Sequence, residues 1–162
     1  MPLISAADNA TLELTSGNTI IGGKNPYLKT TEWGWSVDPM GLRISLIELY
    51  DRYQKPLFVV ENGMGAIDIL TNDKKIHDDY RIEYFKQHLK EMKVATDAGV
   101  EILGYTSWAP IDSISAATSQ ISKRYRFIYV DADDNGNGTY NCYRMDAFYW
   151  YQNVIATNGE SL

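Results

Sequence analysis

Hydrophobic and polar residues are arranged along the chain in blocks that predict helices and strands in turn. From Gly41 to Tyr53, apolar residues recur every three or four positions, which is typical of an amphipathic helix that covers a sheet. The next block, Leu57 to Val60, is continuously apolar and predicts a strand buried on both faces, as in parallel sheets flanked by helices. A helix followed by a strand is half of a repeating α/β unit.

A second unit follows the first. After a polar loop over residues 64–75, apolar residues at helical spacing predict a helix that Asp78 or Asp79 can cap and that ends at 97–99. Residues 100–108 predict a second strand. Two strands joined by such a helix fit a right-handed crossover with parallel strands, which brings both strand ends to one edge of a sheet.

The C-terminal blocks predict a hairpin and a helix. Residues 127–131 predict a strand, 133–138 a turn rich in Asp, Asn and Gly, and 139–144 the returning arm. Aromatic and apolar residues over 148–154 predict a last helix, which Asn158-Gly159 ends. Scattered Ser, Asn, Thr and Gly lead us to expect that residues 1–31 are loosely structured.

Composition narrows the class of protein. The formal net charge of −6 argues against nucleic-acid binding, which usually needs a basic surface. Cys142 is the sole cysteine of the sequence, which rules out an internal disulfide and is compatible with a reducing compartment. No apolar run approaches the roughly 18–20 residues that span a bilayer, and the first residues lack a signal-peptide pattern. We expect a soluble, cytoplasmic protein that binds neither nucleic acid nor membrane.

No metal or cofactor is expected. His77 and His88 have no second ligand at metal-binding spacing, so we interpret both as surface or helix-face residues. The acidic turn at 133–138 lacks the terminal glutamate and flanking helices of a calcium loop. The sequence also lacks a phosphate-binding P-loop and a GxSxG nucleophile motif.

Two groups of residues have chemical character. Glu61 directly follows the first predicted strand, a usual position for catalytic residues in α/β folds, although a merely solvated carboxylate is the alternative. Trp108 ends the second predicted strand. Together with Glu61 it predicts a carbohydrate-binding site, because sugar faces stack on aromatic rings and a carboxylate can attack an anomeric carbon. Lys123, Arg124 and Tyr125 predict either an anion site or a solvated basic turn.

The order of these motifs resembles family 1 of the glycoside hydrolases, retaining enzymes with a (β/α)8 barrel. The resemblance runs from about Asn25 to the end and is carried by separated motifs with natural spacing. They are Trp33-Gly34-Trp35 with Asp38-Pro39, Val59-Val60-Glu61-Asn62-Gly63, Gly104-Tyr105 through Trp108 to Asp112, and Ser122-Lys123-Arg124-Tyr125 with Phe127-Ile128-Tyr129-Val130-Asp131. The resemblance implies an α/β fold that is the C-terminal portion of a TIM barrel: its last two strands, covering helices and a terminal β-hairpin. Residues 1–162 would then form a single partial domain.

Within that family the chain is most similar to the 6-phospho-β-glucosidases. The resemblance implies that Glu61 is the nucleophile, that Trp108 lies under the sugar, and that a phosphorylated β-glucoside is the substrate. Lys123 and Tyr125 would bind the 6-phosphate, with Ser115 as the candidate serine of that site. Ala117 stands at another frequent serine position, and Ala116 replaces a common tryptophan, which resembles the phosphoglucoside pattern. Arg126 replaces a common glycine, so a tight backbone turn there would be altered.

The sequence contains no Asn-Glu-Pro motif, which in this family carries the acid/base glutamate. A retaining glycosidase needs two carboxyl groups, and a complete barrel usually needs at least about 200 residues. We therefore expect the isolated chain to be inactive and to require an N-terminal complementing fragment. The alternative is a non-catalytic truncated product that forms a homo-oligomer or binds sugar phosphate weakly.

Overall fold

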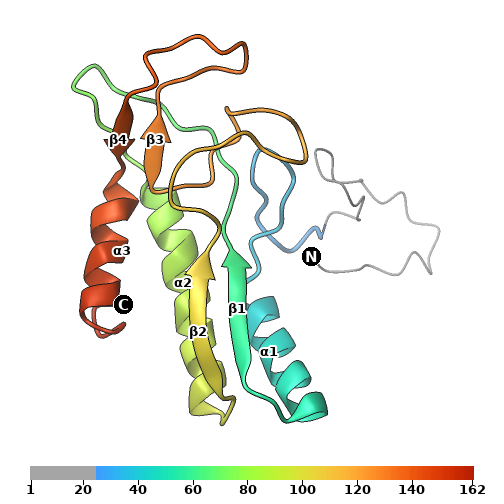
Figure 1. Ribbon diagram of the computed structural model, residues 1–162. Helices are drawn as coiled ribbons and strands as arrows, with labels where there is room; N and C mark the ends of the chain where they lie inside the picture. Colours follow the sequence, from blue (N-terminus) through green and yellow to red (C-terminus); the bar gives the residue numbers. More distant parts are fainter. Residues whose placement is uncertain (1–24) are drawn as a thin grey trace, which may run out of the picture.

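The computed structural model describes residues 25–162 and contains two α/β units followed by a small hairpin and a helix (Figure 1). Most of the segment predicted to be loosely structured, residues 1–24, lies outside the described residues. In chain order the elements are α1 (Pro39–Tyr53), β1 (Leu57–Asn62), α2 (Asp79–Asp97), β2 (Ile102–Ser107), β3 (Ile128–Val130), β4 (Cys142–Arg144) and α3 (Asp146–Ala156).

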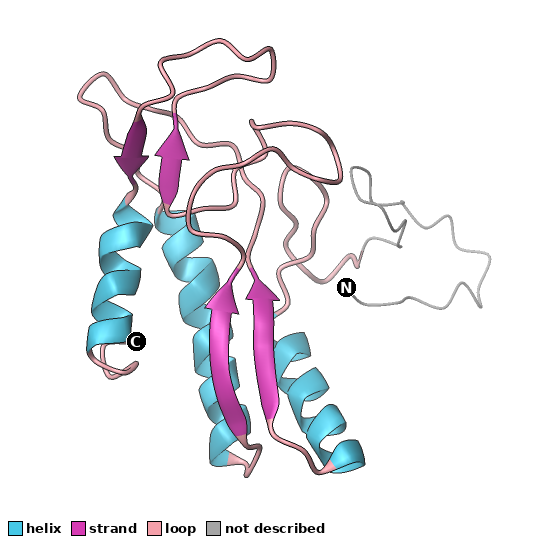
Figure 2. Ribbon diagram, in the orientation of Figure 1, coloured by secondary structure: helices cyan, strands magenta, loops and turns pink. Residues whose placement is uncertain are grey.

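The first two units form one layer of helices on one face of a two-stranded parallel sheet (Figure 2). Leu46 of α1, Ala95 of α2 and Val100 form a buried cluster, against which Leu57 and Ile102 of the strands pack. Helix α1 begins at Pro39 because Asp38 accepts a hydrogen bond from the Gly41 amide at 2.9 Å. The predicted helices, strands and parallel pairing are confirmed.

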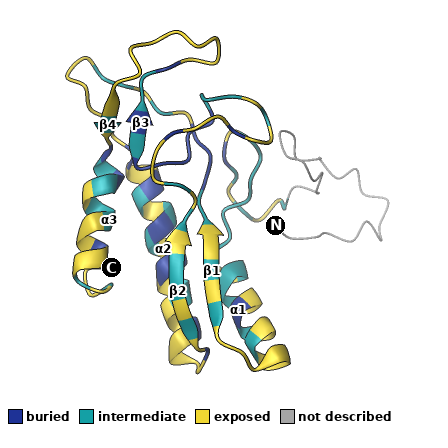
Figure 3. Cartoon of the chain, viewed as in Figure 1, coloured by how far each residue is buried: buried dark blue, intermediate teal, exposed yellow. Residues whose placement is uncertain are grey.

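The opposite face of this sheet is open (Figure 3). Phe58, Val60 and Leu103 are exposed, the last two by 67% and 66%. The prediction of a strand buried on both faces is therefore wrong for the described residues. The apolar run is real, but within residues 25–162 nothing covers its second face, which leaves large side chains in water.

The hairpin and α3 pack against the other end of α2. Strands β3 and β4 pair antiparallel, as predicted. Phe127, just before β3, forms a triangular aromatic cluster with Phe85 of α2 and Tyr151 of α3; its ring centroid lies 5.2 and 4.9 Å from theirs, which lie 5.9 Å apart. This aromatic cluster holds the segment that leads into β3 against the helical layer, and residues 123–127 are all buried.

A buried ion network links α2 to α3. Arg81 of α2 bonds Asp78 at 3.0 Å, Asp68 at 2.6 Å and the Met64 carbonyl at 3.2 Å. Asp78 precedes α2, but its carboxylate does not cap that helix; it accepts a bond from the Ala147 amide at the start of α3 at 2.9 Å. The Asp78 carboxylate therefore binds the start of α3, a helix that begins at Asp146, 68 positions further along the chain.

Among residues 25–162, no helix has the length and apolar character required to cross a membrane.

Candidate functional site

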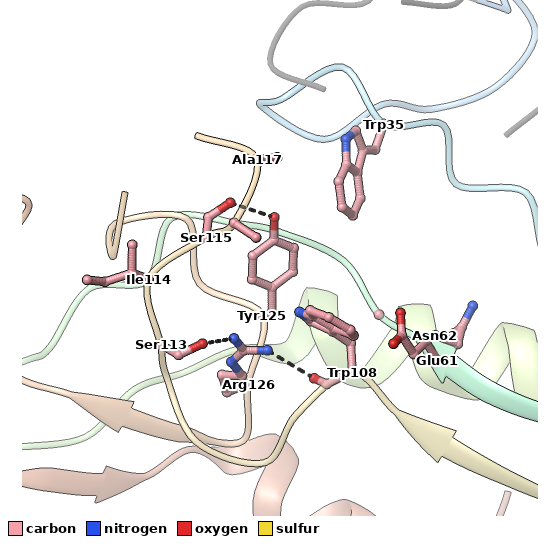
Figure 4. A pocket seen from close by; sticks show the side chains of 12 residues that line it. Trp35, Glu61, Asn62, Trp108, Ser113, Ile114, Ser115, Ala117, Tyr125 and Arg126 are labelled. Carbon is pink, nitrogen blue, oxygen red and sulfur yellow. Dashed lines mark hydrogen bonds between the residues drawn. The ribbon is translucent and has the colours of Figure 1, made fainter. Parts of the chain in front are cut away.

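A pocket of ≈ 400 Å³ lies where β1 and β2 end (Figure 4). Four of the five predicted site residues line it, namely Glu61, Trp108, Ser115 and Tyr125. The fifth, Lys123, is not among the lining residues and is fully buried near the Tyr125 ring. The other residues that line the pocket are Trp35, Asn62, Gly63, Ser113, Ile114, Ala116, Ala117 and Arg126.

An irregularity in β1 directs Glu61 toward the pocket. The register of the parallel pair shifts between Val59 and Asn62, where β1 has one residue more than β2. Consequently the alternation of exposure breaks, and Val60 and Glu61 are exposed one after the other. Bulges of this kind reorient a single side chain at a strand end and are frequent beside active sites.

The two residues after Glu61 accept hydrogen bonds from three neighbours. The Tyr105 hydroxyl on β2 donates to Asn62 Oδ1 at 2.8 Å, and the Trp108 amide donates to the Asn62 carbonyl at 2.8 Å. The Tyr84 hydroxyl donates to the Gly63 carbonyl at 3.2 Å. Burial raises the pKa of the Tyr84 phenol to about 12, so it stays protonated at neutral pH. The two bonds to Asn62 join the ends of the two strands, so Glu61 and Trp108 lie at the same edge of the sheet, as predicted.

The part of the pocket wall that Ser115 and Tyr125 form carries two hydroxyls. Ser115 Oγ and Tyr125 Oη lie 3.4 Å apart, and both residues are buried. Lys123 Nζ lies 5.7 Å from the Tyr125 ring, 4.5 Å from the Trp35 ring and 5.6 Å from the Trp33 ring. Aromatic rings favour an ammonium through their quadrupoles, so this cation is held in a cage of rings that includes the Tyr125 ring.

Pairing with the loop after β1 positions this wall. The amide of Ala66 donates to the Arg124 carbonyl at 2.8 Å, and the Arg124 amide donates back at 3.0 Å. A Cβ on Gly65 would lie 3.1 Å from both Lys123 and Tyr125, so only glycine permits this approach without displacement. Lys123 and Tyr125 are thereby joined to the same loop that leaves Glu61.

Arg124 belongs to a different part of the molecule. Its guanidinium bonds Asp112 at 2.6 Å and the carbonyls of Val130 and Ala132 at 2.8 and 2.7 Å. It also stacks on Tyr129, with 4.2 Å from Cζ to the ring centroid. The prediction that Arg124 joins an anion site is therefore wrong, because its charge is satisfied within the hairpin. The alternative of a solvated basic turn is also wrong, because residues 123–127 are buried.

Comparison with known proteins identifies the family. The sequence profile of glycosyl hydrolase family 1 matches residues 3–160. The chain belongs to glycosyl hydrolase family 1. Over its whole length this family 1 chain is 57% identical to an aryl-phospho-β-D-glucosidase of Bacillus subtilis and 52% identical to a 6-phospho-β-glucosidase of Clostridium longisporum. It spans 34% and 35% of those two relatives, about a third of their length.

Solved structures of the family support the fold. A family 1 β-glucosidase from Thermotoga maritima matches 86% of the chain with a TM-score of 0.77 and 31% identity, and 30% of that enzyme is covered. The predicted fold, a C-terminal portion of a family 1 TIM barrel, is confirmed by these likenesses. The open face of the β1–β2 sheet follows from that fold, since barrel strands face a packed interior.

Sequence reasoning identified some lining residues of this family 1 pocket and missed others. Trp35 was part of a motif, yet no pattern indicated that its ring would lie 5.7 Å from that of Tyr125. Ser113 and Asn62 likewise gave no periodic signal. Arg126 was noted as a departure from a common glycine, but its backbone is not left-handed, so arginine causes no strain there. In the part of the chain that the structure describes, no group of three His, Cys, Asp or Glu could hold a metal ion.

Proposed function

We propose that this chain is the part of a retaining 6-phospho-β-glucosidase that carries the nucleophile and the phosphate-binding wall. The observation that supports this most is that one pocket is lined by a strand-end carboxylate, an indole and a pair of buried hydroxyls (Figure 4). The names of the two relatives, aryl-phospho-β-D-glucosidase and 6-phospho-β-glucosidase, agree with these groups.

In the proposed reaction the Glu61 carboxylate attacks the anomeric carbon of a 6-phospho-β-glucoside and forms a covalent glycosyl-enzyme. The glycosidic oxygen leaves with a proton from a second carboxyl group about 5–5.5 Å from the first, and water then hydrolyses the intermediate. Among the described residues that line the pocket, Glu61 is the only acidic one. The isolated chain is therefore proposed to be inactive.

The phosphate would be recognised by Lys123, Tyr125 and Ser115. Lysine supplies a full positive charge, whereas the two hydroxyls supply directional hydrogen bonds to the phosphate oxygens. Trp108, which follows β2 at the edge where Glu61 lies, would form the apolar platform beneath the sugar ring. This division of roles predicts that substitutions can impair phosphate recognition and sugar stacking separately.

The exposed face of β1 and β2 favours a partner that completes the barrel. Phe58, Val60 and Leu103 form an apolar surface that association would remove from water, at about 25 cal/mol per Å². A complementing fragment from the rest of the barrel is the partner proposed. The second candidate is a non-catalytic homo-oligomer formed through the same face, which sedimentation of the isolated chain across micromolar concentrations would detect.

A chimeric enzyme tests the proposed activity. In it, this chain replaces the matching third of the Bacillus subtilis relative. The chimeric enzyme should hydrolyse p-nitrophenyl β-D-glucoside 6-phosphate, whereas the isolated chain should not. Glu61→Gln, which retains size and removes the nucleophilic charge, should lower kcat by a factor on the order of 10⁴ or more.

Glu101→Gln provides a matched control, because this exposed carboxyl side chain lies just before β2, at the opposite end of the strand from the pocket. It should leave kcat unchanged. Full activity of the Glu61→Gln enzyme would contradict the assignment of the nucleophile.

A further inference from the structure

Arg126 is a buried cation in the wall of the pocket. Its side chain is 2% exposed, and the residue lines the pocket together with Tyr125 and Trp108. Its Cζ lies 5.3 Å from the centroid of the Tyr125 ring and 5.7 Å from that of Trp108 (Figure 4). One terminal nitrogen donates to the Trp108 carbonyl at 3.5 Å, and the other donates to Ser113 Oγ.

Two other buried arginines are paired with carboxylates, whereas Arg126 is not. Arg81 is paired with Asp68 and Asp78, and Arg124 is paired with Asp112. Within residues 25–162, no carboxylate lies within ion-pairing distance of Arg126, and its buried Nε has no hydrogen-bond partner. Burial lowers the pKa of the Arg126 guanidinium; the charge of the Asp112 carboxylate raises this pKa only in part, and Asp112 itself is paired with Arg124.

A buried cation without a counterion is unfavourable, because burial removes the water that solvates the cation and the protein supplies no negative charge in its place. An anion that enters the pocket supplies the missing opposite charge and interacts strongly, since few water molecules screen the pair. Arg126 adjoins Tyr125, whose hydroxyl is paired with that of Ser115 on the proposed phosphate wall. The ligand that best satisfies such a site is a doubly charged phosphate ester.

We propose that Arg126 is a specificity-determining residue that favours a doubly charged phosphate ester over a neutral or singly charged sugar by its own unpaired charge. The inference rests on the proposed function and deepens it, because it assigns the charge preference of the same pocket. Lys123 remains the proposed ligand of the phosphate, and Arg126 acts at longer range. A purely structural role, through the bonds to Trp108 and Ser113, would instead affect all substrates alike.

The test compares two substrates in the chimeric enzyme. Arg126→Gln removes the charge and keeps hydrogen-bonding capacity, whereas Arg126→Lys keeps the charge. We expect Arg126→Gln to lower kcat/KM by about tenfold for p-nitrophenyl β-D-glucoside 6-phosphate and by less than about twofold for the unphosphorylated glucoside. Arg126→Lys should retain most of the preference, and Arg52→Gln, an exposed change of the same type on α1, should retain all of it.

The pH dependence gives a readout that a structural role would not alter. A phosphate ester loses its second proton near pH 6, so the dianion replaces the monoanion between about pH 5 and 7. We expect KM for the phosphorylated substrate to fall over this range more steeply with Arg126 than with Arg126→Gln. Equal losses for both substrates, or pH profiles that stay parallel, would overturn the inference.

Direct binding separates this inference from the proposed function. The 162-residue chain is titrated with glucose 6-phosphate and with glucose, and tryptophan fluorescence reports on Trp35 and Trp108 in the pocket. Weaker binding of glucose 6-phosphate by Arg126→Gln, by about tenfold, supports the inference. Unchanged binding by Arg126→Gln together with weak binding by Lys123→Met overturns the inference alone. Unchanged binding by Lys123→Met overturns the proposed phosphate site.

Discussion

The hydroxyl of Tyr105 on β2 donates a hydrogen bond of 2.8 Å to Oδ1 of Asn62, the last residue of β1. Burial raises the pKa of the Tyr105 phenol well above its ordinary value, so the group remains a donor at neutral pH. Since Asn62 is adjacent to Glu61, this bond fixes the strand end that carries the proposed nucleophile.

Tyr105→Phe should impair turnover of phosphorylated and unphosphorylated substrates equally. The change keeps the ring but leaves the Asn62 amide without its donor, which costs about 1 kcal/mol of stability. We expect kcat of the chimeric enzyme to fall about tenfold, because misplacement of a reacting group is costly.

Tyr140→Phe is the matched control, since the hydroxyl of this exposed residue donates to the Gly136 carbonyl in the hairpin turn. It should leave kcat unchanged. If Tyr105→Phe also left kcat unchanged, the bond to Asn62 would have no role in positioning Glu61.

Gly65→Ala should weaken phosphate recognition specifically. The new Cβ would lie 3.1 Å from side-chain atoms of Lys123 and Tyr125, so both must shift by a few tenths of an ångström. Overpacking of this kind typically costs about 1–3 kcal/mol. We expect KM for the 6-phosphoglucoside to rise several-fold, with little change for the unphosphorylated glucoside.

Gly63→Ala provides the comparison for Gly65→Ala. Its Cβ would lie 3.2 Å from Cβ of Trp108, on the sugar side of the pocket, so it should impair both substrates equally. Identical substrate profiles for the two variants would show that the pocket is not divided into a phosphate side and a sugar side.

The elements that place Glu61 and Trp108 could be predicted because their signals are local. Apolar residues from Gly41 to Tyr53 recur at helical spacing, and Leu57 and Val59 of the following strand pack against the same buried cluster. Parallel pairing then follows from the intervening helix, and it brings the two strand ends together. The proposed roles of Lys123, Tyr125 and Ser115 rest on the family resemblance, since the residues alone also allowed a solvated turn.

The remaining features depend on contacts that no local pattern records. Asp78 has the position of a cap for α2, yet it bonds the Ala147 amide, because α3 packs beside α2. The burial of Arg126 depends on Trp108 and Ser113, which belong to another loop. Such placements are set by tertiary packing, which overrides the preference of an isolated segment.

Asp134→Ala should loosen the loop that carries Ser115. From the hairpin turn, the Asp134 carboxylate accepts bonds from the amides of Ile121 and Ser122 at 2.7 and 2.9 Å and from Ser122 Oγ at 2.6 Å. The Ser122 bonds lower the pKa of Asp134, so the carboxylate is ionised at neutral pH. We expect faster hydrogen exchange of both amides and a KM for the phosphorylated substrate raised about threefold.

Asp133→Ala is the control for Asp134→Ala. Asp133 bonds Asn135 and Asn137 within the turn, so its loss disturbs the hairpin tip without releasing the loop. Exchange at Ile121 and Ser122 should then stay slow. If both variants accelerated it alike, general loosening of the hairpin would be the cause, and the specific contact would be refuted.

Acid should destabilise the fold through His88. This residue of α2 is buried; Nδ1 bonds the Tyr84 carbonyl at 2.7 Å, and the two ring centroids lie 4.0 Å apart. Burial lowers the pKa of His88 below its usual value of about 6.5, so the folded state binds fewer protons than the unfolded state between the two values. The free energy of unfolding is therefore expected to fall as pH decreases from about 6.5 through the folded pKa. Urea unfolding of the chain at pH 7.5 and 5 measures this, and His88→Gln should decline less than the wild type, whereas equal declines would exclude His88 as the source.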